Sequence, residues 1–98
     1  MDKEELRSLI DEVDSQLLVL LNRRVSLVIE LWKLKKAQNL PMYDHAREER
    51  VRDNVCKANK GPLPASAVIH LFQCIIEQSR LVAALQLDLE KPDLDSRR

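Results

Sequence analysis

The sequence predicts an all-α fold with three helices per chain: one long, one short and one of medium length. Apolar residues recur at helical spacing over two long stretches, and the helix-favouring residues Leu, Glu, Lys, Arg and Ala dominate the composition. Glycine occurs once in 98 residues, which leaves little for tight hairpin turns or phosphate-binding loops. The composition therefore disfavours an all-β fold and a nucleotide-binding loop.

The first helix is expected from about Asp2 to about Gln38, because no proline or glycine interrupts this stretch. At 1.5 Å per residue it would be roughly 55 Å long, whereas a compact globule of this size is about 30 to 35 Å across. The helix must therefore project, and its apolar stripe would lie in water on a single chain. This predicts dimerisation. The stripe consists of Leu6, Ile10, Val13, Leu17, Leu20, Leu21, Val28 and Leu31.

Two further helices are expected after the break at Asn39-Leu40-Pro41. Asp44 is expected to cap a helix from about His45 to Asn59. After the loop Gly61-Pro62-Leu63-Pro64, a third helix begins near Pro64 or Ala65 and fades near Glu90. We assign residues 1–90 to one domain and expect residues 91–98 to be a disordered tail. The apolar residues of the third helix that are expected to face the core are Val68, Leu71, Phe72, Ile75, Ile76, Val82 and Leu85.

Charge and motif content exclude several classes of protein. Sixteen basic and sixteen acidic residues give zero net charge, which argues against a nucleic-acid partner. The longest uninterrupted apolar runs, such as Leu17 to Leu21, are far shorter than the roughly 20 residues that span a bilayer. Cys56 and Cys74 form no metal-binding cluster, and they are expected to be reduced and buried rather than joined in a disulfide, which is the alternative. We therefore expect a cytoplasmic protein that binds neither a membrane nor a metal.

Two cations on the long helix are candidates for anion binding. Arg24 falls on the apolar stripe, and Lys35 lies eleven residues on, about 16 Å along the axis and about 20° around it. Val28 and Leu31 lie between them on the same face. Two cations separated by an apolar floor suit a small anion with a hydrophobic ring. The alternative is that both side chains extend to the surface from the edge of the stripe.

Other polar residues have simpler explanations when taken alone. Arg7 lies about 25 Å from Arg24 along the helix, so it is either a surface arginine or a residue that enters a partner's site. A serine on the inward face of a helix often donates to a backbone carbonyl of its own helix, and this is the simpler explanation of Ser79. A helix cap and first-turn charges account for Asp44 together with Arg47 and Glu48.

Taken in order, five segments of the chain resemble the all-helical class of chorismate mutases. They cover about Leu6 to Ala83, and the specific signal is the ordered set with matched spacing rather than any single segment. The segments are Leu6-Arg7-x-x-Ile10-Asp11-x-x-Asp14, Leu17-Leu18-x-Leu20-Leu21-x-Arg23-Arg24, Lys33-Leu34-Lys35, Pro41-Met42-Tyr43-Asp44-x-x-Arg47-Glu48 and Leu71-Phe72-Gln73-x-Ile75-Ile76-Glu77-x-Ser79.

The resemblance implies an intertwined helical homodimer that rearranges chorismate to prephenate in aromatic amino-acid biosynthesis. It implies no cofactor and no covalent intermediate. Arg24 and Arg7 of the partner subunit would bind the two substrate carboxylates, assisted by Ser79. Lys35 would lie at the ether oxygen, where negative charge develops as the C–O bond breaks.

The resemblance also assigns the opposite end of the substrate and the walls of its site. Glu48 would accept a hydrogen bond from the ring hydroxyl, and Asp44 and Arg47 would shape that end of the site. Leu31 and Ile76 would form apolar walls. A pericyclic reaction needs geometry and charge rather than a nucleophile, which agrees with these residue types.

Two positions depart from the family pattern. The family usually carries Gln or Glu one turn after the serine, as a second donor to the ether oxygen, and this chain has Ala83. Loss of such a donor typically costs about 10² to 10³ in rate, so we expect Ala83→Gln to raise the rate if the pocket is otherwise intact. The family usually has an apolar residue of the site wall at the position of Arg80. Arg80 would either supply a compensating cation or point to solvent.

These departures leave three functions open. The first is a chorismate mutase, slow alone or assisted by another shikimate-pathway protein. The second is a related enzyme that acts on isochorismate or on an amino analogue of chorismate. The third is a non-catalytic helical module that binds a ligand or regulates a partner enzyme.

Overall fold

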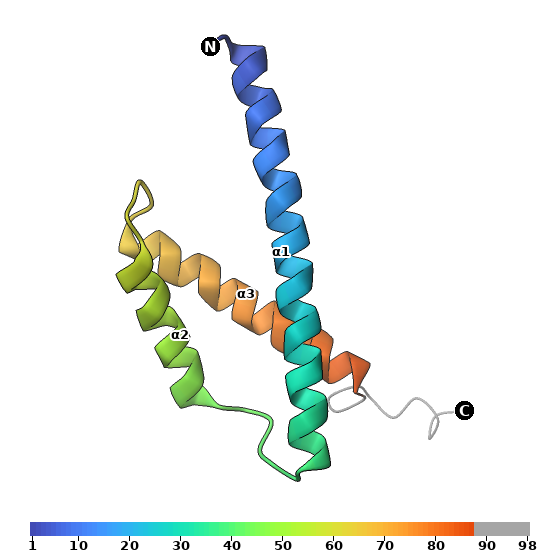
Figure 1. Ribbon diagram of the computed structural model, residues 1–98. Coiled ribbons are helices and arrows are strands. Elements are labelled where there is room, and N and C mark those ends of the chain that lie inside the picture. Colours follow the sequence, from blue (N-terminus) through green and yellow to red (C-terminus); the bar gives the residue numbers. More distant parts are fainter. Residues whose placement is uncertain (88–98) are drawn as a thin grey trace, which may run out of the picture.

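The computed structural model describes residues 1–87, which form three α-helices and no strand (Figure 1). Helix α1 spans Lys3–Ala37, α2 spans His45–Ala58 and α3 spans Ala65–Gln86. The prediction of an all-α fold with a long, a short and a medium helix is confirmed. The expected tail, residues 91–98, lies outside the described residues.

Helix α1 begins and ends at residues suited to those positions. The Asp2 carboxylate accepts a hydrogen bond from the Glu5 amide at 2.8 Å, which satisfies one of the free first-turn donors. At the other end Asn39 adopts a left-handed φ of 59°. The Leu40 amide then donates to the Lys35 carbonyl at 2.8 Å, and the Asn39 amide donates to Lys36 at 3.2 Å. This is the Schellman arrangement, which stops the helix just before Pro41.

The ends of the other two helices agree with the prediction except at the C-terminus of α3. Asp44 caps α2, since its carboxylate accepts from the Arg47 amide at 2.9 Å. Helix α3 was expected to continue to about Glu90, but it ends at Gln86. Leu87 leaves the helix there and packs against the buried cluster around Trp32, which gives the earlier stop a physical reason.

Helix α3 is the central helix of the described part of the chain. It packs against both α1 and α2, while the N-terminal half of α1 projects away from the other helices (Figure 1). The chain is 58 Å long, with a radius of gyration of 17.4 Å, compared with about 13 Å for a compact chain of this size. The projection predicted from the length of the first helix is therefore present.

The buried core is small and lies where α1 crosses α3. Trp32 is 5% exposed, and Ala83 and Ala84 are fully buried against it. Val68 and Ile76 of α3 are also buried, as predicted.

Several residues expected inside are exposed on the single chain. Leu71 and Leu85 were predicted to face the core, but both are exposed. Cys56 and Cys74 are unpaired, yet the expected burial is wrong for Cys74, which is exposed, and incomplete for Cys56. The core of one chain is simply too small to cover these side chains, because few residues of α1 pack against the rest.

Helix α3 is long and apolar enough to cross a membrane by length and composition alone. Polar residues divide the apolar stretches of this helix, so no uninterrupted apolar run in the sequence predicts it. In the structure α3 packs against both neighbouring helices, and its Arg80 pairs with Glu48 of α2. These contacts are those of the central helix of a bundle.

Candidate active site

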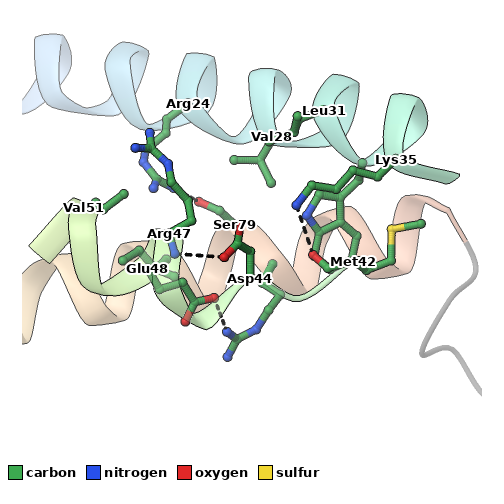
Figure 2. Close-up of a pocket in the computed structure, with 13 residues that line it drawn as sticks. Arg24, Val28, Leu31, Lys35, Met42, Asp44, Arg47, Glu48, Val51 and Ser79 are labelled. Atoms are coloured by element: carbon green, nitrogen blue, oxygen red, sulfur yellow. Dashed lines mark hydrogen bonds and ion pairs between the residues drawn. The ribbon is translucent and has the colours of Figure 1, made fainter. Parts of the chain in front are cut away.

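A cavity of about 150 Å³ lies where the C-terminal half of α1 faces the start of α2 and the middle of α3 (Figure 2). All three helices and the α1–α2 loop contribute to its wall. The lining residues are Arg24, Val28, Leu31, Trp32 and Lys35 from α1, Met42 and Asp44 from the loop, Arg47, Glu48 and Val51 from α2, and Ile76, Ser79 and Arg80 from α3.

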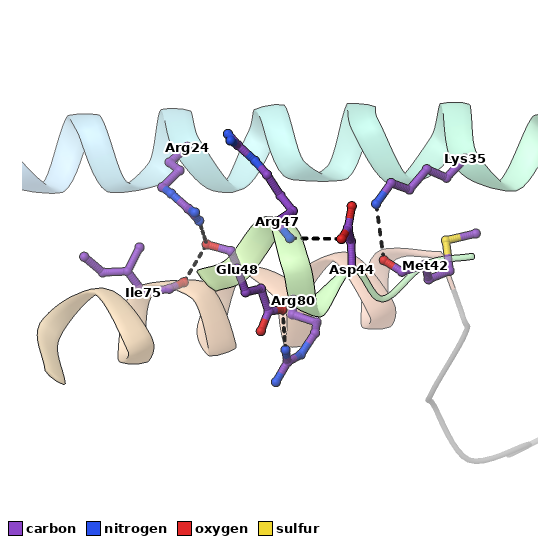
Figure 3. A network of polar contacts seen from close by, with 9 residues as sticks. Arg24, Lys35, Met42, Asp44, Arg47, Glu48, Ile75 and Arg80 are labelled. Carbon is purple, nitrogen blue, oxygen red and sulfur yellow. Dashed lines mark hydrogen bonds and ion pairs between the residues drawn. The ribbon is translucent and has the colours of Figure 1, made fainter. Parts of the chain in front are cut away.

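Arg24 is anchored at one end of this cavity by Ser79. Its Nη1 donates to the Ser79 hydroxyl oxygen at 2.8 Å, and the hydroxyl donates to the Ile75 carbonyl at 2.7 Å (Figure 3). Ser79 thus makes the bond within its own helix and also holds the arginine. Burial, and secondly the nearby charge of Arg47, lower the pKa of Arg24. A bound anion would offset both effects.

Lys35 lies at the other end, beyond an apolar floor. Its Nζ donates to the Met42 carbonyl at 3.4 Å, a long contact that a better acceptor can replace. Val28 and Leu31 lie between the two cations on α1 (Figure 2). The predicted arrangement of two cations separated by an apolar surface is therefore present, and the alternative that both extend into solvent does not hold.

The start of α2 supplies the carboxylates of the cavity. Asp44 lies at the cap of α2, and Glu48 lies one turn further along. Arg80 of α3 donates from Nη1 to Glu48 Oε2 at 2.6 Å, and its guanidinium carbon lies 5.2 Å from the centre of the Tyr43 ring. Arg80 therefore neither points to solvent nor stands as a free cation, because it is committed to Glu48.

The charge of the lining suits an anion. Four cations, Arg24, Lys35, Arg47 and Arg80, face two carboxylates, Asp44 and Glu48, so four minus two leaves an excess of two positive charges. A small dicarboxylate with an apolar ring matches this balance of charge and surface.

Nine of the eleven site residues predicted from the sequence line this cavity. Arg7 does not, since it lies in the projecting half of α1 and pairs with Glu4 at 3.0 Å on the surface. Ala83 does not either, because it is buried in the cluster around Trp32. The nine are Arg24, Leu31, Lys35, Asp44, Arg47, Glu48, Ile76, Ser79 and Arg80.

Sequence reasoning missed three lining residues, Trp32, Met42 and Val51. Trp32 lies three residues before Lys35, so helical spacing already placed it next to a predicted site residue. Met42 contributes through its backbone carbonyl, which no side-chain pattern reveals.

Comparison with known proteins identifies the family. The sequence model of chorismate mutase type II matches residues 6–84. This chain belongs to that family. The resemblance drawn from the five sequence segments is thereby confirmed.

Individual chorismate mutases support the same assignment. The chain is 37% identical over 89 residues to a bifunctional chorismate mutase/prephenate dehydratase of Escherichia coli, covering 88% of this chain and 23% of that protein. It is 29% identical over 85 residues to a chorismate mutase of Methanocaldococcus jannaschii, covering 86% of each. The chain thus spans about a quarter or less of the bifunctional relatives and most of the single-function one.

A solved structure has the same fold. A chorismate mutase from Thermus thermophilus (form II) superposes with a TM-score of 0.77 at 34% identity, covering 92% of this chain and 94% of that one. The helical architecture described above is therefore that of the family.

Proposed function

We propose that this chain catalyses the Claisen rearrangement of chorismate to prephenate in aromatic amino-acid biosynthesis, in the cytoplasm and without a metal or cofactor. The observation that carries the proposal is the cavity in which Arg24 and Lys35 stand at opposite ends of an apolar floor. Family membership supports it independently.

Binding would hold the substrate in its reactive conformer. Arg24, oriented by Ser79 at 2.8 Å, receives one carboxylate, and Arg7 of the partner subunit receives the other. Leu31 and Ile76 contact the ring. Chorismate is flexible in water, so fixing the enolpyruvyl side chain over the ring removes much of the entropic part of the barrier.

The electrostatic contribution is made at the breaking bond. As the ether C–O bond breaks, a C–C bond forms between the side chain and the ring, and negative charge grows on the ether oxygen. Lys35 exchanges its 3.4 Å contact with the Met42 carbonyl for this oxygen, which gains charge only in the transition state. At the other end of the substrate, Glu48 accepts a hydrogen bond from the ring hydroxyl, and Asp44 and Arg47 flank Glu48.

Completion of the site requires a homodimer. The projecting half of α1 carries a continuous set of exposed apolar side chains, namely Leu6, Leu9, Ile10, Val13, Leu17, Leu18, Val19, Leu20 and Leu21. An exposed apolar surface of this extent favours association. A partner helix lying along it would bring the partner subunit's Arg7, which is about 25 Å from Arg24 within one chain, to the open end of the cavity.

The test is direct: purified chain is incubated with chorismate, and prephenate formation is followed. Steady conversion supports the proposal, and absence of prephenate at high enzyme concentration contradicts it. Pyruvate release from isochorismate, or rearrangement of an amino analogue in preference to chorismate, would instead indicate a related enzyme. Binding of a bicyclic transition-state mimic without turnover of any of them would indicate a regulatory module.

A further inference from the structure

The proposed function leaves the ether oxygen with one identified donor, Lys35. The charge that develops there is best stabilised by donors already in position. Ala83, one turn after Ser79, has no polar side-chain atom and is fully buried. The structure therefore prompts the question of whether another donor faces the same end of the cavity.

Trp32 is the candidate. It lies three residues before Lys35 on α1, so the two side chains leave the helix on neighbouring positions of one face. It lines the cavity, and its ring packs directly against the buried cluster that contains Ala83 and Ala84. Trp32 is therefore a neighbour of Lys35 on α1 and shares a buried cluster with Ala83, the position where the resemblance places the family's second donor.

The indole N–H of Trp32 is available. It is a donor and never an acceptor, and within residues 1–87 no acceptor is paired with it. Yet no buried side-chain nitrogen or oxygen in this part of the chain lacks a partner. The N–H is consequently not sealed in the core, although Trp32 as a whole is only 5% exposed. The nitrogen therefore keeps some exposure, and the ring to which it belongs lines the cavity.

We propose that the Trp32 indole N–H is the second hydrogen-bond donor to the ether oxygen, acting beside Lys35 in place of a side chain at position 83. The inference rests on the proposed function and adds a catalytic residue to it. Packing against Ala83 and Ala84 and the edge-on contact with Tyr43, at 6.2 Å between ring centres, fix the ring before substrate arrives. A small residue at position 83 is what leaves room for the ring.

Trp32→Phe tests the donor, because it removes the N–H and keeps an aromatic ring. We expect kcat to fall about 10- to 100-fold with little change in KM, since the bond forms chiefly in the transition state. Ile29→Val is the matched control. Ile29 packs against the same cluster from outside the cavity, so its kcat should stay within about twofold of wild type.

A rescue separates a donor from a packing role. Trp32→Ala should lose at least as much kcat as Trp32→Phe, and adding Ala83→Gln to it returns an amide donor to the vacated space. We expect the double variant to regain about tenfold or more over Trp32→Ala. A ring that merely fills space would give no such recovery.

Fluorescence supplies a readout that is independent of turnover. Trp32 is the only tryptophan in the chain, so its emission should change when a bicyclic dicarboxylate mimic of the transition state binds. Unchanged emission on binding, or wild-type kcat in Trp32→Phe, would overturn this inference while leaving the mutase activity intact. A wild-type chain that forms no prephenate would instead overturn the proposed function, and this inference with it.

Discussion

Ser79 shows how one small side chain organises the Arg24 end of the cavity. It is 2% exposed, and its hydroxyl both donates to the Ile75 carbonyl and accepts from Arg24. Because the bond to Ile75 fixes the hydroxyl hydrogen, the oxygen lone pairs are directed toward the arginine. Ser79 thereby holds the Arg24 guanidinium in place before any substrate binds, while burial and, secondly, the charge of Arg47 lower the pKa of Arg24.

Lys35 provides the sharpest test of the electrostatic contribution. Lys35→Met keeps the length of the side chain and removes the charge, and we expect kcat/KM to fall by about 10² to 10³. Lys36→Met is the control, since Lys36 is the exposed neighbour in the same last turn of α1 and should keep wild-type activity. Equal activity of the two variants, measured as prephenate formation, would contradict the role given to Lys35.

Ala83 is the residue at which the structure changes an expectation. From the sequence, Ala83→Gln was expected to raise the rate. The structure places Ala83 at 0% exposure against Trp32, so a glutamine there has to displace the ring. We now expect the single variant to lose about 1 to 3 kcal/mol of unfolding free energy and to gain no activity.

Urea denaturation of the Ala83→Gln variant measures this loss. Glu77→Gln, a substitution at an exposed position of the same helix, should change the unfolding free energy by no more than about 0.5 kcal/mol. A stable Ala83→Gln variant with increased kcat would show that the ring is not packed as described.

The site residues divide into those that a pattern can predict and those that need the fold. Arg24 and Lys35 were predictable because a cation on an apolar helix face is unusual and their spacing can be calculated. Trp32 was not singled out, since an aromatic residue on such a face is ordinarily core. The pairing of Arg80 with Glu48 joins residues 32 positions apart, and no local pattern specifies which partner a side chain on α3 will meet.

At the scale of elements, the end of α1 sets the position of a functional group. The Schellman arrangement at Asn39 turns the chain so that the Met42 carbonyl lies 3.4 Å from Lys35 Nζ. Helix boundaries were predicted closely here, because Asn39 and Pro41 carry strong local preferences. At the end of α3 no such residue follows Gln86 directly, and Leu87 packs against the cluster around Trp32, a tertiary contact that no local pattern predicts.

Asn39 allows this element to be tested. A left-handed backbone costs an alanine about 1 kcal/mol more than glycine, and asparagine lies between them. We expect Asn39→Ala to lower the free energy of unfolding by about 0.5 to 1 kcal/mol and Asn39→Gly to leave it unchanged or slightly raised. Urea denaturation at one protein concentration checks both. A lower stability for glycine than for alanine would contradict the geometry.

At the scale of the whole molecule, the proposed homodimer would account both for the exposed stripe of α1 and for the distance of Arg7 from the cavity. Burying a leucine is worth about 1.5 to 3 kcal/mol, and Leu17 and Leu18 are among many that one chain leaves exposed. A second chain laid along α1 would cover them and extend the small core. The sequence predicted this need from the length of the first helix and its apolar stripe, but it could not show how much of the stripe one chain covers, since that depends on where α3 crosses α1.

Mixing two inactive variants tests the dimer and the shared site together. In an Arg7→Met dimer and in an Arg24→Met dimer, every site lacks one arginine. In a mixed dimer, one site takes Arg24 from the first chain and the partner's Arg7 from the second, and is therefore intact. Random exchange makes half of the dimers mixed, so activity should return to about a quarter of wild type.

The control mixes Arg24→Met with Lys35→Met. Both of these residues come from the same chain in every site, so each site of a mixed dimer still lacks one of them and activity should stay low. Formation of mixed dimers is followed separately, by tagging one variant and measuring co-purification. Mixed dimers that form without recovering activity in the Arg7→Met and Arg24→Met pair would show that Arg7 does not act across the interface.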